Sequence, residues 1–147
     1  MFFDTTDLKD KEIYLRLSKT AEENKDKGYV PAYYFTIVRC ADNVEVGSCD
    51  LRIGHNENTK YAGNIGYEIY EPFRGNRYAS KACKLLFILT KKHMMNEIII
   101  TCSPENIESR KTCEYIGAEF IGIVGLPSWH EIYKSGRRNT CQYIVRL

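Results

Sequence analysis

The hydrophobic periodicity of this chain changes at Pro72. Before that residue, Ile65, Tyr67 and Ile69 alternate with other residues, which is the period of a strand with one buried face. After it, apolar residues recur at the spacing of one helical face: Ala79, Ala82, Cys83, Leu86 and Leu89. The chain therefore combines strands with helices, and the segment from Pro72 to Arg77 must turn from one to the other.

Four segments before Pro72 have the composition of strands. They are Glu12–Leu17, Tyr33–Val38, Val44–Ile53 and Asn64–Tyr70. The second and third flank a turn at Asp42 and Asn43, which predicts a hairpin, and the fourth follows as its next partner. Between the first two strands, the polar stretch Ser18–Lys27 is predicted to be a helix that ends at Gly28.

After Pro72 the pattern predicts a helix from Arg77 to about Met95, a buried strand at Ile98–Thr101 and a helix at Asn106–Ile116. Gly117 stands where a left-handed helix cap belongs. The last two strands are Glu119–Val124 and Thr140–Arg146. This order predicts an α+β fold, in which a mixed, mostly antiparallel central sheet is flanked by helices.

Length and composition narrow the functional classes. The 147 residues suit one domain, residues 1–147. A net charge of +2 is too small for a nucleic-acid or anionic-membrane binder. No apolar run reaches the roughly 18 residues of a membrane helix, and the N-terminus does not resemble a signal peptide. Six scattered cysteines without a Cys-x-x-Cys pair predict buried, reduced thiols, no metal site and a cytoplasmic protein.

The turn from Arg74 to Ala79 opens the long helix and is the first candidate site. Backbone amides at a helix start are unsatisfied and carry the positive end of the helix dipole, so a phosphate fits there. Arg74 and Arg77 add charge. A plain strand-to-helix turn with exposed arginines is the alternative, whereas the glycine patterns of the common nucleotide-binding loops are absent.

A second segment begins at Asn106, a natural N-cap residue, with Ser109 at the third helical position. It continues through the helix to Gly117 and Ala118. Taken alone, this segment indicates no more than a capped helix.

Together and in this order, the two segments resemble the GNAT superfamily of acyl-CoA-dependent N-acetyltransferases. The family signature, Arg/Gln-x-x-Gly-x-Gly/Ala, corresponds to Arg74–Ala79; its later Asn-x-x-Ser corresponds to Asn106–Ser109, and its Gly-Phe to Gly117-Ala118. The resemblance is strongest from Gly63 to Gly122 and is closest to the branch of the ribosomal-protein alanine acetyltransferases. It implies a splayed strand pair at the acyl-CoA site.

The resemblance implies direct transfer of an acetyl group from acetyl-CoA to a primary amine, either a small amine or a peptide N-terminus. The residues implied to bind acetyl-CoA lie in the two motifs: Ile69, Tyr70, Arg74, Gly75, Asn76, Arg77, Tyr78, Ala79, Asn106 and Ser109. A non-catalytic acyl-CoA-binding or regulatory module is the alternative, and a homodimer is left open.

Two departures from the family pattern concern the chemistry. Arg77 replaces a glycine of the turn, so its side chain must either point away or contact phosphate. Cys113 stands where many members have a tyrosine general acid, and is predicted to protonate the leaving thiolate. Glu68 is the first candidate for the general base, with His55, His130 or water as alternatives.

The loop Gly125–Asn139 is the candidate acceptor site. Loops longer than about 12 residues are usually functional or disordered, and the only Trp of the chain argues against disorder. Its aromatic residues beside one carboxylate suit an ammonium group: Trp129, His130, Glu131 and Tyr133. A loop held in place by its own Trp is the alternative.

Overall fold

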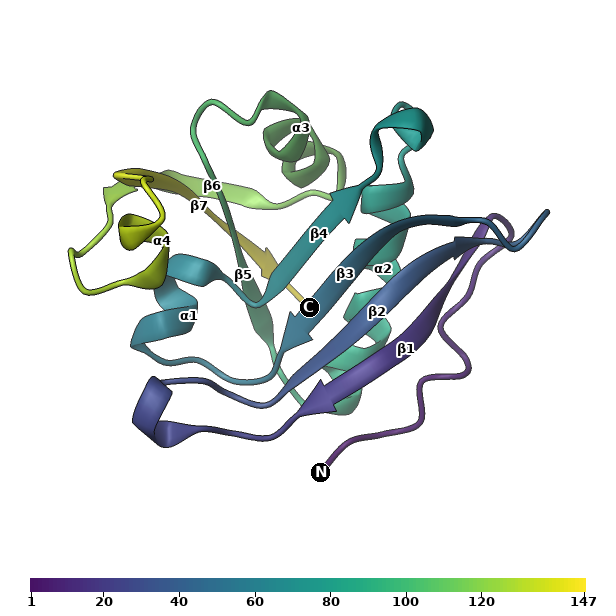
Figure 1. Ribbon diagram of the computed structural model, residues 1–147, viewed down its shortest axis with the longest axis horizontal. Helices are drawn as coiled ribbons and strands as arrows, with labels where there is room; N and C mark the ends of the chain where they lie inside the picture. The colour runs from purple at the N-terminus through teal and green to yellow at the C-terminus, as the bar shows by residue number, and fades with distance from the viewer.

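Seven strands form two antiparallel sheets, whose strands β4 and β5 diverge from each other (Figure 1). The computed structural model describes residues 1–147. The first sheet has the order β1-β2-β3-β4 and the second the order β5-β7-β6. The strands are β1 (Ile13–Ala21), β2 (Ala32–Arg39), β3 (Glu45–Arg52), β4 (Ile65–Ile69), β5 (Glu97–Cys102), β6 (Glu119–Gly125) and β7 (Asn139–Arg146).

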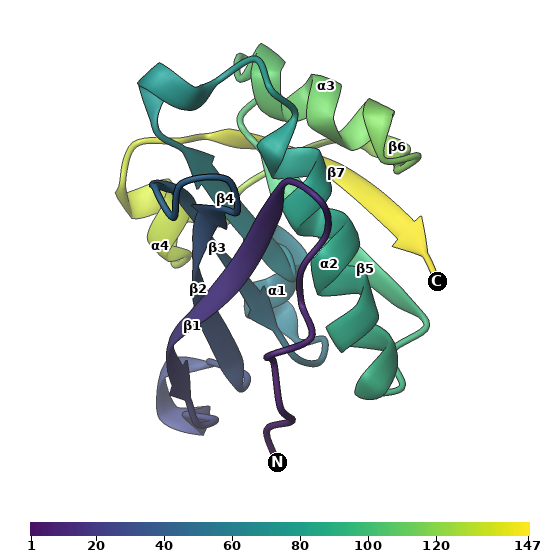
Figure 2. The ribbon, with the colours of Figure 1, turned by 90° about the vertical axis from the view of Figure 1, so that its right-hand side faces the viewer.

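Four α-helices and two short 3₁₀ turns connect the strands. They are η1 (Lys25–Lys27), α1 (Glu57–Ala62), η2 (Glu71–Phe73), α2 (Tyr78–Lys92), α3 (Ile107–Tyr115) and α4 (Glu131–Lys134). Helix α2 covers one face of the first sheet, whereas α4 lies on the opposite side (Figure 2). The buried face of α2 packs into the main hydrophobic core through Ala82, Cys83, Leu86 and Leu89.

The two sheets are joined at Asn64 and then diverge. The Asn64 amide donates to the Ile99 carbonyl at 2.6 Å, and Asn64 Oδ1 accepts from the Ile99 amide at 2.9 Å. Beyond this point β4 and β5 belong to different sheets. The diverging strands run toward the end of the molecule that carries η2 and α3 (Figure 1), and this confirms the expected splayed strand pair.

The predicted helix at Ser18–Lys27 is wrong. Strand β1 continues to Ala21, where Thr20 and Ala21 pair with Tyr33 and Ala32, and only the 3₁₀ turn η1 follows. Pairing with the aromatic strand β2 overrides the weak local preference of this polar sequence. Gly28 does adopt the left-handed cap conformation, with φ of 74°.

Most other predicted elements are confirmed to within a few residues, including Gly117 in the left-handed region. Helix α1 is not among the predicted helices; it is stabilised by a capping box between Asn56 and Thr59. Strand β5 buries Ile98 and Ile100 but leaves Ile99 half-buried, so it is not enclosed on both faces as predicted. All six cysteines are free thiols, and five are buried. No helix is long and apolar enough to cross a bilayer.

Candidate active site

The turn between β4 and α2 has an unusual backbone conformation for its sequence. Arg77 is the N-cap of α2 and has φ of 62°, a left-handed value that costs a non-glycine residue about 1–2 kcal/mol. Its side chain does not cap the helix, so the first N–H groups of α2 keep their capacity to bind a ligand. Arg74 Nε donates to the Ile69 carbonyl at 2.9 Å and fixes the end of β4 against the turn.

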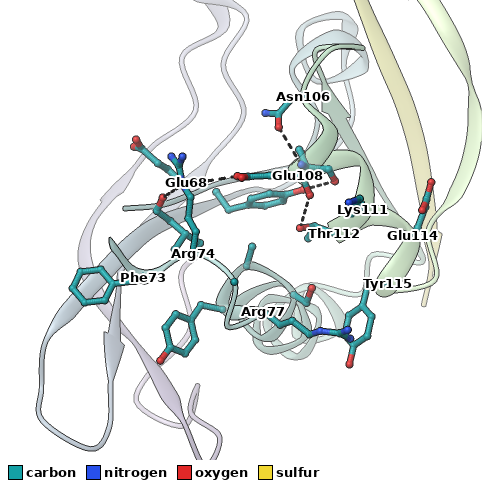
Figure 3. A pocket seen from close by; sticks show the side chains of 17 residues that line it. Glu68, Phe73, Arg74, Arg77, Asn106, Glu108, Lys111, Thr112, Glu114 and Tyr115 are labelled. Atoms are coloured by element: carbon teal, nitrogen blue, oxygen red, sulfur yellow. Dashed lines mark hydrogen bonds and ion pairs between the residues drawn. The ribbon is translucent and has the colours of Figure 1, made fainter. Parts of the chain in front are cut away.

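A cavity of about 890 Å³, here called the turn cavity, lies between this turn and α3 (Figure 3). All the predicted acetyl-CoA residues line it except Tyr70 and Asn76. The structure adds further lining residues that sequence reasoning missed, among them Lys111 and Tyr115 of α3.

The Arg77 side chain reaches across the mouth of the turn cavity to α3. Its guanidinium carbon lies 4.0 Å from the centre of the Tyr115 ring, and hydrogen bonding to Arg77 lowers the pKa of the Tyr115 hydroxyl (Figure 3). Lys84 lies over the same ring at 5.4 Å. The cation is therefore held at the cavity mouth, where it can meet an anion.

Asn106 is the N-cap of α3, as predicted, because its Oδ1 accepts from the Ser109 amide at 3.1 Å. The Ser109 hydroxyl shares a hydrogen bond of 2.8 Å with the Tyr67 hydroxyl. Burial raises the pKa of Tyr67 well above its usual range, so this phenol stays protonated. Sequence reasoning had placed Tyr67 only as an apolar strand residue; a buried tyrosine hydroxyl needs a partner, and α3 supplies it.

A second cavity, here called the loop cavity, has a volume of about 560 Å³ and lies between β4, β5 and the loops around Tyr29 and His130. Tyr67, Asn106 and Ser109 line both cavities. The two cavities therefore meet at these three residues, in the gap that the diverging strands β4 and β5 leave.

The loop Gly125–Asn139 is ordered by His130, which is buried although it lines the loop cavity. Its Nδ1 accepts from the Ile132 amide at 3.1 Å, and its Nε2 lies 3.2 Å from the Asn58 carbonyl oxygen. Because a carbonyl only accepts, Nε2 carries the proton. Both ring nitrogens are therefore occupied by backbone groups, and His130 holds α4 against α1 rather than serving as a free base.

The other three predicted acceptor residues are divided between the cavity and the surface. Glu131 lines the loop cavity and accepts a hydrogen bond from the Tyr29 hydroxyl, which closes the cavity on one side. Trp129 is 53% exposed and packs edge-on against Tyr61, and Tyr133 stacks with Arg138; neither lines the cavity. The interpretation of a loop held partly by its own Trp fits these contacts.

Replacing His130 with alanine is expected to release α4 from α1. The change leaves the Asn58 carbonyl and the Ile132 amide without their partner, so the free energy of unfolding should fall by about 2–3 kcal/mol. Amide hydrogen exchange at Ile132 should rise more than exchange in β7. Unchanged protection at Ile132 would contradict this role.

The two predicted catalytic residues lie in different surroundings. Glu68 is exposed and lines the turn cavity. Cys113 is fully buried, lines neither cavity and has its sulfur 3.8 Å from the Tyr67 hydroxyl. Burial also raises the pKa of the Cys113 thiol to about 12, so it stays protonated at neutral pH. Because Cys113 lines neither cavity whereas Tyr67 and Ser109 line both, its position does not favour it as the general acid.

Comparison with known proteins gives a consistent result. A family model described as an acetyltransferase (GNAT) domain matches residues 2–119. The uncharacterized N-acetyltransferase YnaD of Bacillus subtilis (strain 168) is 35% identical over 95 residues, which span 57% of this chain and 56% of that relative. The matched region thus covers little more than half of the relative's length.

Solved structures share the fold at low sequence identity. The ribosomal-protein alanine acetyltransferase of Vibrio fischeri superposes with a TM-score of 0.61 at 18% identity, over 78% of this chain and 61% of that chain. RimL, described as a ribosomal alpha-N-protein acetyltransferase in complex with coenzyme A, superposes with a TM-score of 0.67 at 14% identity, over 94% of this chain and 96% of that chain.

Proposed function

The chain belongs to the GNAT acetyltransferase family, and from this premise we propose that it transfers the acetyl group of acetyl-CoA directly to a primary amine. One observation carries the proposal: two cavities adjoin each other and share Tyr67, Asn106 and Ser109 as lining residues. Direct transfer needs both substrates bound at once with their reacting atoms adjacent. Two adjoining cavities with shared lining residues would place both substrates in this way.

The turn cavity has the features that the phosphates of acetyl-CoA require. The start of α2 offers backbone N–H groups without intrahelical partners, together with the positive end of the helix dipole. Arg74, Arg77 and Lys111 line the same cavity, together with the carboxylates of Glu68, Glu108 and Glu114, and their cationic groups can contact phosphate. Among the solved relatives, RimL binds coenzyme A. We therefore assign the turn Arg74–Ala79 to the pyrophosphate and Asn106 to the arm that leads inward.

At the junction, the hydroxyls of Tyr67 and Ser109 are the groups that can donate a hydrogen bond to the departing thiolate. Both stay protonated at neutral pH, and they are already joined to each other at 2.8 Å. Acetyl-CoA supplies the activated acyl group, and the chain supplies orientation and hydrogen bonds that stabilise the charge formed during transfer.

The acceptor occupies the loop cavity in this proposal. Tyr29, Tyr34, Glu22 and Glu131 line it, and aromatic rings beside carboxylates suit an ammonium group. The named structural neighbours act on ribosomal proteins, which supports a peptide N-terminus, while a small amine would also fit. The free thiols suit a reducing compartment, and we expect the protein to act in the cytoplasm.

The proposal is tested by release of free thiol from acetyl-CoA in the presence of single amines. A suitable panel contains n-butylamine, glucosamine and short peptides with free or blocked N-termini. We expect amine-dependent thiol release, with a mass increase of one acetyl group on the amine. Saturable acetyl-CoA binding without turnover of any amine would show a binding module instead.

A further inference from the structure

Asp50 is a carboxylate for which the fold provides no evident structural role. It lies at the centre of β3, where the flanking residues Cys49 and Leu51 point into the core beneath α2. Side chains alternate along a strand, so Asp50 points to the opposite face. Its neighbours on that face are Tyr34 on β2 and Gly66 on β4, and both line the loop cavity. Asp50 does not itself line the cavity, but it lies directly between these two lining residues on the same face of the sheet.

The Asp50 carboxylate has an ion-pair partner, but one of its oxygens accepts no hydrogen bond. Oδ2 is fully shielded and accepts no hydrogen bond, although Arg52 Nη2 lies 3.0 Å away as an ion-pair partner. Arg52 is itself fixed by donating to the Gly63 carbonyl at 3.0 Å. A shielded carboxylate oxygen whose one partner is an ion pair is uncommon in native proteins, so this carboxylate keeps capacity for a further hydrogen-bond donor.

Because Gly66 on β4 has no side chain, there is space beside it for the other carboxylate oxygen of Asp50, Oδ1. A Cβ atom at position 66 would lie 2.6 Å from Asp50 Oδ1, so any larger residue would displace the carboxylate. The side chain of Asp50 retains 19% exposure. The arrangement thus keeps one oxygen beside Gly66, one residue before Tyr67 at the junction of the cavities.

We infer that Asp50 binds the ammonium group of the acceptor and removes its proton. This inference rests on the proposed function and adds to it the group that receives the amine. The ammonium transfers one proton to the Asp50 carboxylate, and the free amine attacks the thioester carbonyl carbon. The carbon–sulfur bond breaks, and the second proton lost from nitrogen goes to the CoA thiolate. The products are an amide, CoA and a protonated Asp50, which releases its proton to water.

The groups that face Asp50 fit this role. Arg52 on its own strand is the single cation in contact with it. Tyr34 on β2 presents an aromatic ring, and the ammonium group of Lys19 on β1 lies over that ring. Glu68 lies two residues beyond Gly66 on β4, on the same face of the sheet. Burial raises the pKa of the Asp50 carboxyl, and Arg52 partly opposes this effect. A carboxylate with a raised pKa is a stronger base.

The binding step can be tested without knowing the natural acceptor. The protein is labelled with ¹³C at the aspartate carboxyls and saturated with CoA, and n-butylammonium is titrated at neutral pH. We expect a saturable shift of the resonance that Asp50→Asn removes, and no shift with n-butanol. Absence of a saturable shift would overturn the inference, whether or not any amine is acetylated.

The chemical step is tested with the amine that the wild type acetylates fastest. Asp50→Asn is expected to lower kcat/KM by roughly 10²–10⁴-fold without changing acetyl-CoA affinity. Gly66→Ala should act in the same direction because it displaces the carboxylate. The control, Glu45→Gln, removes an exposed carboxylate on the same strand and should have no effect.

A pH series separates catalysis from folding. In the wild type, kcat/KM should rise with pH as Asp50 ionises, and Asp50→Asn should lose this limb. The folded-state pKa of Asp50 is raised, so ionisation costs stability as pH rises. Asp50→Asn should therefore have a higher Tm at neutral pH, and the gain should vanish in acid. The role of Asp50 as the base would be refuted if Asp50→Asn kept the wild-type kcat/KM. It would also be refuted if Glu68→Gln, and not Asp50→Asn, caused a large loss. Either result would leave the proposed function unchanged.

Discussion

Replacing Asn64 with alanine is expected to lower the free energy of unfolding by about 3–5 kcal/mol, the largest stability effect of any single polar substitution proposed here. Asn64 is fully buried where the two sheets meet. Its Nδ2 donates to the Arg52 and Gly54 carbonyls at 3.1 and 2.8 Å, and its Oδ1 accepts from the Ile99 amide. The alanine variant removes the side-chain partner of all three of these partly buried backbone groups.

Urea denaturation measures this effect, with Asn96→Ala as a matched control at an exposed position. The control should change the free energy of unfolding by no more than about 0.5 kcal/mol. Since Asn64 holds β4 to β5, the variant should also show faster amide exchange at Ile99. A loss no greater than that of the control would mean that the backbone bond from Asn64 to Ile99 alone joins the sheets.

Charge reversal at Arg74 is expected to weaken CoA binding about 10- to 100-fold, because charge-assisted hydrogen bonds contribute about 1.5–3 kcal/mol. The Nε atom of Arg74 is occupied by the Ile69 carbonyl, which leaves the two Nη groups for a phosphate. In Arg74→Glu the new carboxylate would also lie near Glu108, which is 3.9 Å from Arg74 Nε. Both changes make the turn cavity less favourable for an anion.

Calorimetric titration with CoA measures this second effect. Arg16→Glu serves as the control because Arg16 is an exposed arginine on β1 and lines neither cavity. The affinity of Arg74→Glu should also depend less on salt than that of the wild type, since a phosphate contact is lost. Equal affinity in the two variants would remove Arg74 from the binding site.

Local sequence signals predicted the helix caps that frame the turn cavity. Asn106 and Gly117 act through neighbouring backbone groups, so their roles as helix caps can be read from a few residues. The turn Arg74–Ala79 is equally local, and most of it lines the cavity. The left-handed conformation of Arg77 was not predictable, because its side chain is held by Tyr115 on a different helix.

The loop cavity depends on contacts between distant segments and was only partly predicted. Tyr29 and Glu131 are far apart in sequence, yet they share one hydrogen bond. The shielding of Asp50 needs Arg52 and the missing side chain of Gly66 on the next strand, so no local pattern marks it. Cys113 was proposed from its position in a motif alone, and the packing of α3 shows it to be a core residue.

The strand order of the second sheet has a consequence for the way the chain folds during synthesis. β1 to β4 pair with their neighbours in sequence and can form a meander as soon as residue 69 is available. β7 lies between β5 and β6, and each of these two strands pairs with β7 alone. The second sheet therefore cannot close until Arg146 has left the ribosome. Such non-local pairing slows folding and leaves the apolar β5 exposed in the nascent chain, within reach of chaperones.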